Sequence, residues 1–130
     1  MDTDICIFLL QGKFGIDSKV KEVGIQNCFV SEITIAELKY GAENSSSYQK
    51  HIQEVEKIEK LFGIIPIYGA LDHYAKEKVR LQKEGALIPD FDLLIGTTSV
   101  ANDLTMVTNN ERHLKRVSGI QLENWIEASV

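Results

Sequence analysis

Cysteine and proline are scarce in this sequence, with two of each in 130 residues. Two cysteines are too few for a disulfide framework or for a zinc site built from cysteine, so we expect Cys6 and Cys28 to be buried, reduced thiols. No apolar run reaches the roughly 18 residues of a membrane-spanning helix, so no membrane contact is expected. The apolar residues 5–10 have no basic region before them, which argues against a signal peptide and makes the cytoplasm the expected location.

The sequence also has fewer positively charged residues than negatively charged ones. There are 14 lysines and arginines against 19 aspartates and glutamates, which gives a net charge of −5. A nucleic-acid-binding protein with this balance needs a local basic patch, a metal ion, or both. The hydrophobic content of 44% and the charged content of 25% are typical of a globular chain. With no internal repeat or linker, residues 1–130 are expected to form a single domain.

Short runs rich in β-branched residues alternate with longer segments of helical periodicity. The runs predict strands at residues 28–30, 64–67, 105–108 and 120–122. The helical segments lie at residues 52–62, 71–82 and about 91–102. Because strands and helices alternate, we predict a three-layer α/β fold, with a mainly parallel sheet and helices on both of its faces.

Polar residues and glycine mark the expected helix ends. Thr34 and Glu37 have the spacing of a capping box at the start of a helix. Ser47 and Asp90 fit the N-cap positions of two further helices, and Gly85 fits a C-terminal cap.

Four carboxylates fall at predicted element boundaries, where ligands of parallel α/β folds collect: Asp2, Glu37, Asp90 and Asp92. Converging carboxylates raise one another's pKa unless a cation neutralises them. Oxygen ligands without a set of histidines or cysteines suit Mg²⁺ or Mn²⁺, and such an ion can support phosphodiester hydrolysis. Each acid also has a structural interpretation: Glu37 in the capping box, Asp92 in the first turn of a helix, and Asp2 as an exposed terminal residue.

The order of four sequence segments along the chain gives more evidence about function than the spacing of the acids does. Residues 1–10 (MDTDICIFLL), 31–42 (SEITIAELKYGA), 89–96 (PDFDLLIG) and 104–110 (LTMVTNN) follow one another in that order, and LENW stands at residues 122–125. These segments together resemble the PIN-domain ribonucleases, and most closely the VapC toxins of bacterial type II toxin–antitoxin pairs. The resemblance spans essentially the whole chain.

The resemblance implies a PIN fold with four or five parallel strands flanked by helices. It implies a metal-dependent endoribonuclease, a hydrolase that uses Mg²⁺ or Mn²⁺ held by Asp2, Glu37 and Asp92. Asn110 takes the fourth catalytic position with Thr108 nearby, and Asp4 supports the first acid. The partners it implies are an RNA substrate, a cognate antitoxin and a second copy of the chain.

Three features depart from the family pattern. Only Met1 precedes Asp2, where the family has several apolar residues that form a central strand, so this strand is expected to be short or to need further residues. Asn110 is an amide rather than an acid. His113 and Leu114 replace the usual acid–aromatic pair, and we expect His113 to be exposed or to cap a helix, with a phosphate contact as the alternative.

Basic residues that follow Asn110 are the candidates for RNA binding. Arg112, Lys115 and Arg116 are close enough in sequence to contact a phosphate at the site, although a solvated helix face would have the same composition. The alternative function is a PIN-fold binding module that has lost nuclease activity. A receiver-type signalling domain fits poorly, because no strand ends in a suitable aspartate followed by a later strand-end lysine.

Overall fold

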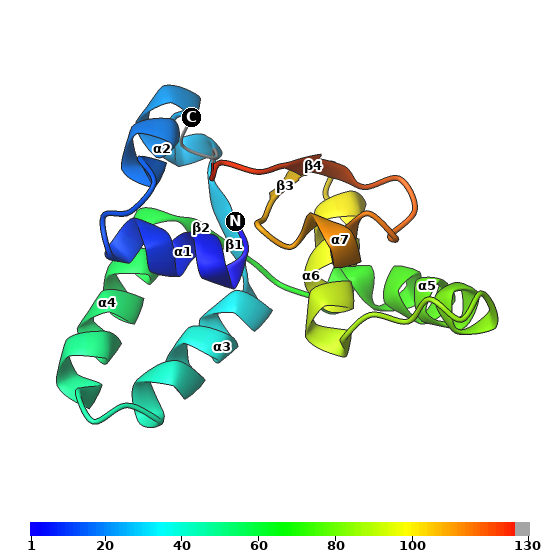
Figure 1. Cartoon of the computed structure of the whole chain (residues 1–130), viewed down its shortest axis with the longest axis horizontal. Helices are drawn as coiled ribbons and strands as arrows, with labels where there is room; N and C mark the ends of the chain where they lie inside the picture. Colours follow the sequence, from blue (N-terminus) through cyan, green and yellow to red (C-terminus); the bar gives the residue numbers. More distant parts are fainter. Residues whose placement is uncertain (127–130) are drawn as a thin grey trace.

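The computed structural model describes residues 1–126. Its strands are short and its helices make up most of the chain (Figure 1). The helices are α1 (Thr3–Leu10), α2 (Ile16–Val23), α3 (Glu32–Glu43), α4 (Tyr48–Leu61), α5 (Leu71–Lys83), α6 (Asp90–Ala101) and α7 (Glu111–Leu114), with 3₁₀ turns at Ile25–Asn27 and Tyr68–Ala70. The strands are β1 (Phe29–Ser31), β2 (Gly63–Ile65), β3 (Thr105–Val107) and β4 (Gln121–Glu123). All four strands begin within one residue of the predicted positions, and β2 ends two residues earlier than predicted.

The strands pair in parallel, as predicted, but they form two separate sheets rather than one. β1 pairs with β2, with Phe29 opposite Gly63, and β3 pairs with β4, with Thr105 opposite Gln121. Residues 1 and 2 lie between the two pairs: the amino group of Met1 donates to the Phe29 carbonyl at 2.8 Å. The Asp2 amide donates to the Val107 carbonyl at 2.9 Å. Two residues can make only these isolated bonds, so they connect the pairs without forming a continuous ladder.

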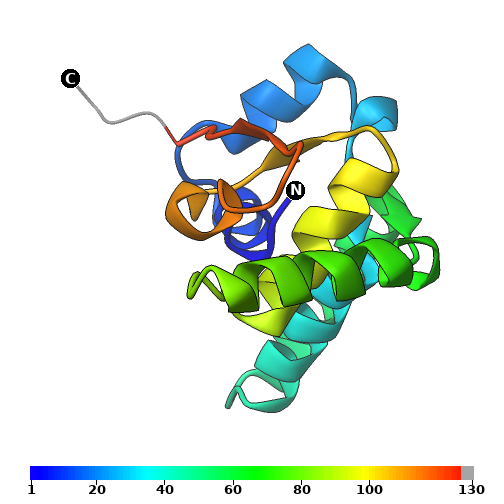
Figure 2. The same ribbon diagram turned by 90° about the vertical axis from the view of Figure 1, so that its right-hand side faces the viewer.

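Two clusters of buried apolar side chains lie on opposite sides of β3. Met106 belongs to the cluster with Leu81, Leu93 and Leu114, from helices α5, α6 and α7. Its neighbour Val107 points the other way, into the cluster built by helices α1 to α4. Successive side chains of a strand face opposite sides, so β3 contributes to both clusters. Figure 1 shows helices α1 to α4 on one side of the molecule and α5 to α7 on the other. Figure 2 views the molecule from the second side, with α5 in front. The predicted parallel strands flanked by helices are therefore present, as two small sheets.

Both cysteines are buried free thiols, as predicted. Cys6 is fully buried in α1, and Cys28 lies just before β1. Both belong to the cluster of helices α1 to α4. None of the helices within residues 1–126 combines the length and the hydrophobicity that crossing a bilayer requires.

The predicted helix caps are correct in part. The capping box is wrong: Ser31, not Thr34, is the N-cap of α3, and its hydroxyl accepts from the Ile33 amide at 3.1 Å. The true cap lies three residues earlier because β1 runs directly into α3 at Ser31. Asp90 is the first residue of α6 rather than its cap.

Two other caps lie where they were expected. Ser47 occupies the N-cap position of α4, although its side chain makes no capping bond. Gly85 follows α5 with φ +66°, a left-handed conformation that glycine adopts readily.

Candidate active site

Asp2 anchors the site at the carboxyl end of β3. It is the N-cap of α1, where its Oδ1 accepts from the Thr3 amide at 2.7 Å. Its Oδ2 accepts from the Thr108 hydroxyl at 2.8 Å. Thr108 follows β3 directly and is fully buried, while Asp2 is only 8% exposed. The interpretation of Asp2 as an exposed terminal residue is therefore wrong, because both of its oxygens are held inside the fold.

Glu37 reaches the same place from α3. Its Oε1 accepts from the Thr3 hydroxyl at 2.6 Å. Thr3 therefore touches two acids, Asp2 through its amide and Glu37 through its hydroxyl. Sequence reasoning missed Thr3; the available signal was a hydroxyl residue directly after the first acid. This bond also explains why Glu37 does not cap α3, since its carboxylate points toward α1.

Asp92 lies in the first turn of α6, where it meets two residues at the other end of the site. Its Oδ2 accepts from the Asn110 side-chain amide at 3.2 Å and lies 3.4 Å from His113 Nδ1. The Asn110 amide nitrogen is also 3.1 Å from His113 Nδ1. His113 is therefore a member of the site, and the expectation of an exposed or capping histidine is wrong. The local sequence could have indicated this, because His113 lies three residues after Asn110, the N-cap residue of α7.

These contacts form one continuous set. The backbone amide of Asn110 donates to the Thr108 hydroxyl at 2.8 Å, which links the Asp2 end to the Asp92 end. We call the connected residues the acid site: Asp2, Thr3, Glu37, Asp92, Thr108, Asn110 and His113. All the predicted catalytic positions belong to it.

Two predicted acids lie outside this set. Asp4 is exposed and makes no hydrogen bond with the site. Asp90 pairs elsewhere, with Lys78 Nζ and the Tyr74 hydroxyl, each at 2.9 Å.

Burial and mutual repulsion act on the acids together. Burial raises the pKa of the Glu37 carboxyl, the Thr3 hydroxyl opposes that rise, and the negative charges of Asp2 and Asp92 add to it. Burial likewise raises the pKa of Asp92, and the negative charge of Asp2 raises it further. The contact with His113 lowers the pKa of Asp92 and opposes part of this rise. The carboxyl groups are close enough to repel one another. A cation between them would remove this repulsion.

The donor chemistry fits a hard divalent cation. Within residues 1–126, no three acidic, histidine or cysteine side chains converge closely enough to form a complete metal cage. Mg²⁺ seldom has such a cage, because it is typically held by one or two carboxylates, several waters and substrate phosphates. A cavity of about 540 Å³ between α1, α3 and α4 is bordered by Glu37, but by no other residue of the acid site. The residues therefore fit Mg²⁺ or Mn²⁺ bound partly through water.

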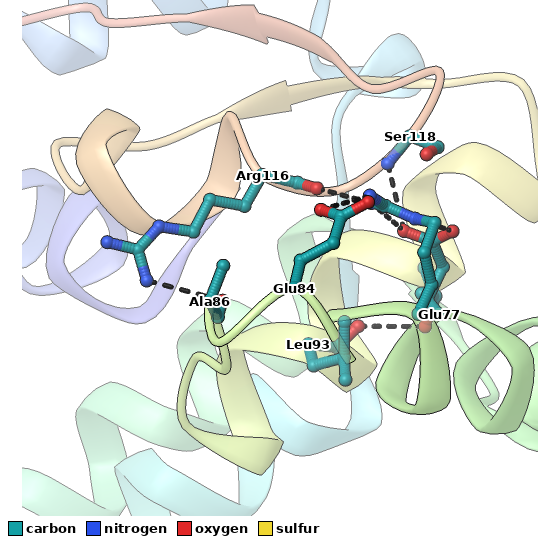
Figure 3. A network of polar contacts seen from close by, with 8 residues as sticks. Glu77, Glu84, Ala86, Leu93, Arg116 and Ser118 are labelled. Carbon is teal, nitrogen blue, oxygen red and sulfur yellow. Dashed lines mark hydrogen bonds and ion pairs between the residues drawn. The ribbon is translucent and has the colours of Figure 1, made fainter. Parts of the chain in front are cut away.

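The three predicted RNA-binding residues differ in their surroundings. Arg112 and Lys115 are exposed around α7. Arg116 is half-buried, and its Nη1 donates to the Ala86 carbonyl at 3.3 Å (Figure 3). The same nitrogen donates to the Leu87 carbonyl, also at 3.3 Å. Arg116 therefore attaches the loop that leads into α6, which leaves Arg112 and Lys115 as the more accessible cations.

A second polar cluster lies between α5 and the segment that follows α7. Glu77 on α5 accepts from Arg80 Nε at 3.0 Å and Nη2 at 2.8 Å, and from the Ser118 amide at 3.0 Å (Figure 3). Arg80 also donates to the Arg116 carbonyl at 2.7 Å. We call Glu77, Arg80, Arg116 and Ser118, with Glu84 as an outer partner of Arg80, the Glu77 network. It fastens α5 to the segment that follows α7.

Comparisons with known proteins agree with this geometry. The model of the PIN domain family matches residues 1–120. The chain is also 33% identical to Ribonuclease VapC2 of Haemophilus influenzae, over 97% of this chain and 96% of the relative. The chain belongs to the VapC ribonucleases of the PIN-domain family. The match includes every segment that contributes to the acid site.

Two further VapC proteins show the extent of the similarity. The tRNA(fMet)-specific endonuclease VapC of Shigella flexneri is 28% identical over 96% of both chains. In the crystal structure of VapBC2 from Rickettsia felis bound to a DNA fragment from its promoter, one chain is 27% identical and superposes with a TM-score of 0.88. That superposition covers 95% of this chain and 96% of the other. The arrangement of elements is thus shared with a VapC structure almost from end to end.

Proposed function

We propose that this chain is a metal-dependent endoribonuclease that acts as the toxin of a type II toxin–antitoxin pair. The observation that carries the proposal is the acid site, in which Asp2 comes from the N-cap of α1, Glu37 from α3 and Asp92 from α6. They are joined through Thr3, Thr108 and Asn110. A chain of the VapC ribonuclease family with this arrangement has the groups that phosphodiester hydrolysis requires.

Asp2, Glu37 and Asp92 would hold Mg²⁺ or Mn²⁺ through their carboxylate oxygens. When bound, such an ion activates water and offsets charge at the phosphate. The hydroxyl of Thr108 has one proton, which it donates to Asp2, and it accepts the Asn110 amide proton. Thr108 therefore fixes the orientation of the Asp2 carboxylate, and Thr3 does the same for Glu37.

Arg112 and Lys115 are the residues we assign to RNA binding. Both are exposed beside α7, which also supplies His113 to the site. Their charges can bind phosphates on either side of the cleaved bond and compensate locally for the net charge of −5. Arg116 has a structural role instead, since its guanidinium group is bonded to backbone carbonyls.

The partner in this proposal is a protein antitoxin that covers the site. The solved relative from Rickettsia felis is a VapBC2 assembly. The acidic charge of this chain suits a partner segment rich in arginine or lysine. We further propose a homodimer and a single domain over residues 1–130, as the family resemblance implies.

Cleavage of RNA by the purified chain tests the proposal. With Mg²⁺ or Mn²⁺ present we expect internal cleavage that leaves 5′-phosphate and 3′-hydroxyl ends, the products of attack by water. EDTA abolishes the cleavage, and added Mg²⁺ or Mn²⁺ restores it. Asp92→Asn lowers it by at least about 100-fold. Asp72→Asn, which changes an exposed acid in the first turn of α5, is the matched control and leaves cleavage unchanged. Cleavage that survives EDTA contradicts the proposal.

One observation favours the alternative of a binding module without activity. Asn110 provides an amide at the fourth catalytic position, so the site has one negative charge fewer than a set of four acids would have. If divalent ions raise the melting temperature while no RNA is cleaved under any condition, this alternative is correct.

A further inference from the structure

Three side chains converge on one point between α6 and α7. Asn110 Nδ2 lies 3.2 Å from Asp92 Oδ2 and 3.1 Å from His113 Nδ1. Asp92 Oδ2 and His113 Nδ1 are themselves 3.4 Å apart. The three atoms thus form a nearly equilateral triangle, although they come from α6, from the loop before α7 and from α7.

The amide nitrogen of Asn110 can only donate hydrogen bonds, and it has two protons. That nitrogen is within hydrogen-bonding distance of both Asp92 Oδ2 and His113 Nδ1. In the tautomer in which Nδ1 carries no proton, lone pairs of His113 and Asp92 face the same electropositive group. In the other tautomer His113 Nδ1 donates to Asp92 Oδ2. A cation bound beside the three side chains would satisfy the lone pairs of both.

We propose that His113 is a metal ligand, and that His113 Nδ1, Asp92 Oδ2 and the Asn110 side-chain oxygen form one face of a divalent cation site. This inference rests on the proposed function, because it extends the metal site of the acids. Adjacent ligands about 2.1 Å from an octahedral ion lie about 3 Å apart. The three observed separations need to close by only a few tenths of an ångström, and the Asn110 amide needs to turn over to present its oxygen.

Solvent can reach this position. The side chain of His113 is 35% exposed and that of Asp92 is 22% exposed. An ion can therefore enter without unfolding, and the open side leaves room for water and for a substrate phosphate. His113 is held in place by α7, whose residue Leu114 is buried in the second apolar cluster.

A nitrogen ligand changes which ion the site prefers. Mg²⁺ takes oxygen ligands, whereas imidazole favours first-row transition-metal ions. We therefore expect Mn²⁺ to bind more tightly than Mg²⁺, and His113 to be the cause. A histidine that only orients Asp92 through a hydrogen bond would affect the two ions equally.

Electron spin-echo measurements of Mn²⁺ bound to the full chain test the proposal directly. We expect a nitrogen-14 coupling from a directly bound imidazole in the unaltered protein. The coupling is absent in His113→Ala and present in His51→Ala. His51 is a matched control, because it also lies beside a carboxylate, Glu54, at 3.1 Å, with a side chain that is 43% exposed.

Calorimetric titration supplies the second measurement. His113→Ala weakens Mn²⁺ binding by roughly 10- to 100-fold and Mg²⁺ binding by less than about threefold. Bound Mn²⁺ without nitrogen coupling in the unaltered chain overturns the proposal, and so does equal weakening of both ions. If neither ion binds the unaltered chain, the proposed function fails as well, so the two failures are distinguishable.

Discussion

The acid site and the Glu77 network both contain carboxylates that join distant parts of the chain, yet their electrostatics are opposite. Glu77 is only 6% exposed, and hydrogen bonds from Arg80 lower its pKa to about 2. Burial raises the pKa values of Glu37 and Asp92 instead. The difference is the source of compensating positive charge: Arg80 supplies it to Glu77, whereas neighbouring acids act on Glu37 and Asp92.

The comparison distinguishes the structural role of Glu77 from the functional role that we propose for Glu37 and Asp92. Removing one partner of a buried ion pair within the fold is destabilising, because it leaves the other charge without compensation. Carboxylates that repel one another weaken the fold until an external cation arrives. The following substitutions are designed to break or sharpen this contrast.

The largest expected effect on stability is at Glu77. Glu77→Gln removes the charge that pairs with Arg80 and should lower the free energy of unfolding at pH 7 by about 3 kcal/mol. The pKa of Glu77 is lower in the folded state than in the unfolded state. Its contribution is therefore complete above the unfolded value of 4.5 and is lost as the pH falls toward 2. Urea unfolding of both proteins between pH 7 and 3 should show the difference shrinking on acidification.

Glu84→Gln is the matched control for this prediction. Glu84 contacts the same arginine at 3.1 Å, but its side chain is 56% exposed. Its loss should change the free energy of unfolding by less than about 0.5 kcal/mol, as for most exposed ion pairs. Equal effects of the two substitutions would contradict a special role for the buried carboxylate.

Thr3→Val should affect activity more than stability. It removes the 2.6 Å hydrogen bond that orients Glu37, so we expect RNA cleavage to fall about tenfold. Thr3→Ser keeps the hydroxyl and should restore most of the activity. Initial cleavage rates at several Mg²⁺ concentrations, together with melting curves, provide the measurement. A parallel loss of folding in Thr3→Val would make Thr3 structural, like Glu77.

The smallest expected effect is a gain in stability. In EDTA, Asp92→Asn removes a charge that the folded state disfavours, so the free energy of unfolding should rise by roughly 0.5 kcal/mol. With Mg²⁺ or Mn²⁺ present, the unaltered protein should have the higher free energy of unfolding, because ion binding stabilises it more than it stabilises Asp92→Asn. Thermal melts with and without the ion test this sign change. A lower melting temperature of Asp92→Asn in EDTA would show that Asp92, like Glu77, stabilises the metal-free fold.

Much of the fold was predictable from local patterns. The strands at Phe29–Ser31 and Thr105–Val107 were found because short β-branched runs differ from helical periodicity. The α6 helix was placed to within one residue for the same reason. The start of α3 was misplaced, because the spacing of Thr34 and Glu37 imitates a capping box while Ser31 makes the actual bond.

The candidate site was predictable in its acids but not in its connections. Asp2, Glu37 and Asp92 stand out because carboxylates at element boundaries are chemically conspicuous. Thr3 and His113 are not conspicuous, since their roles depend on partners 34 and 21 residues away. The division of the strands into two pairs agrees with the expected shortness of the central strand, because residues 1 and 2 make only one backbone hydrogen bond each to β1 and β3.

The sequence by itself determined the kind of protein: its periodicities specify an α/β fold, and its acids specify the chemistry of a cation site. These properties follow from residue type and near neighbours, which the order of residues contains. Only the tertiary structure decided which carboxylates receive a positive partner from within the chain. Glu77 meets Arg80 one turn away and Ser118 41 residues away, while Asp92 meets Asn110 and His113. The physical reason is that charge compensation acts over a few ångströms of space, whatever the distance along the chain.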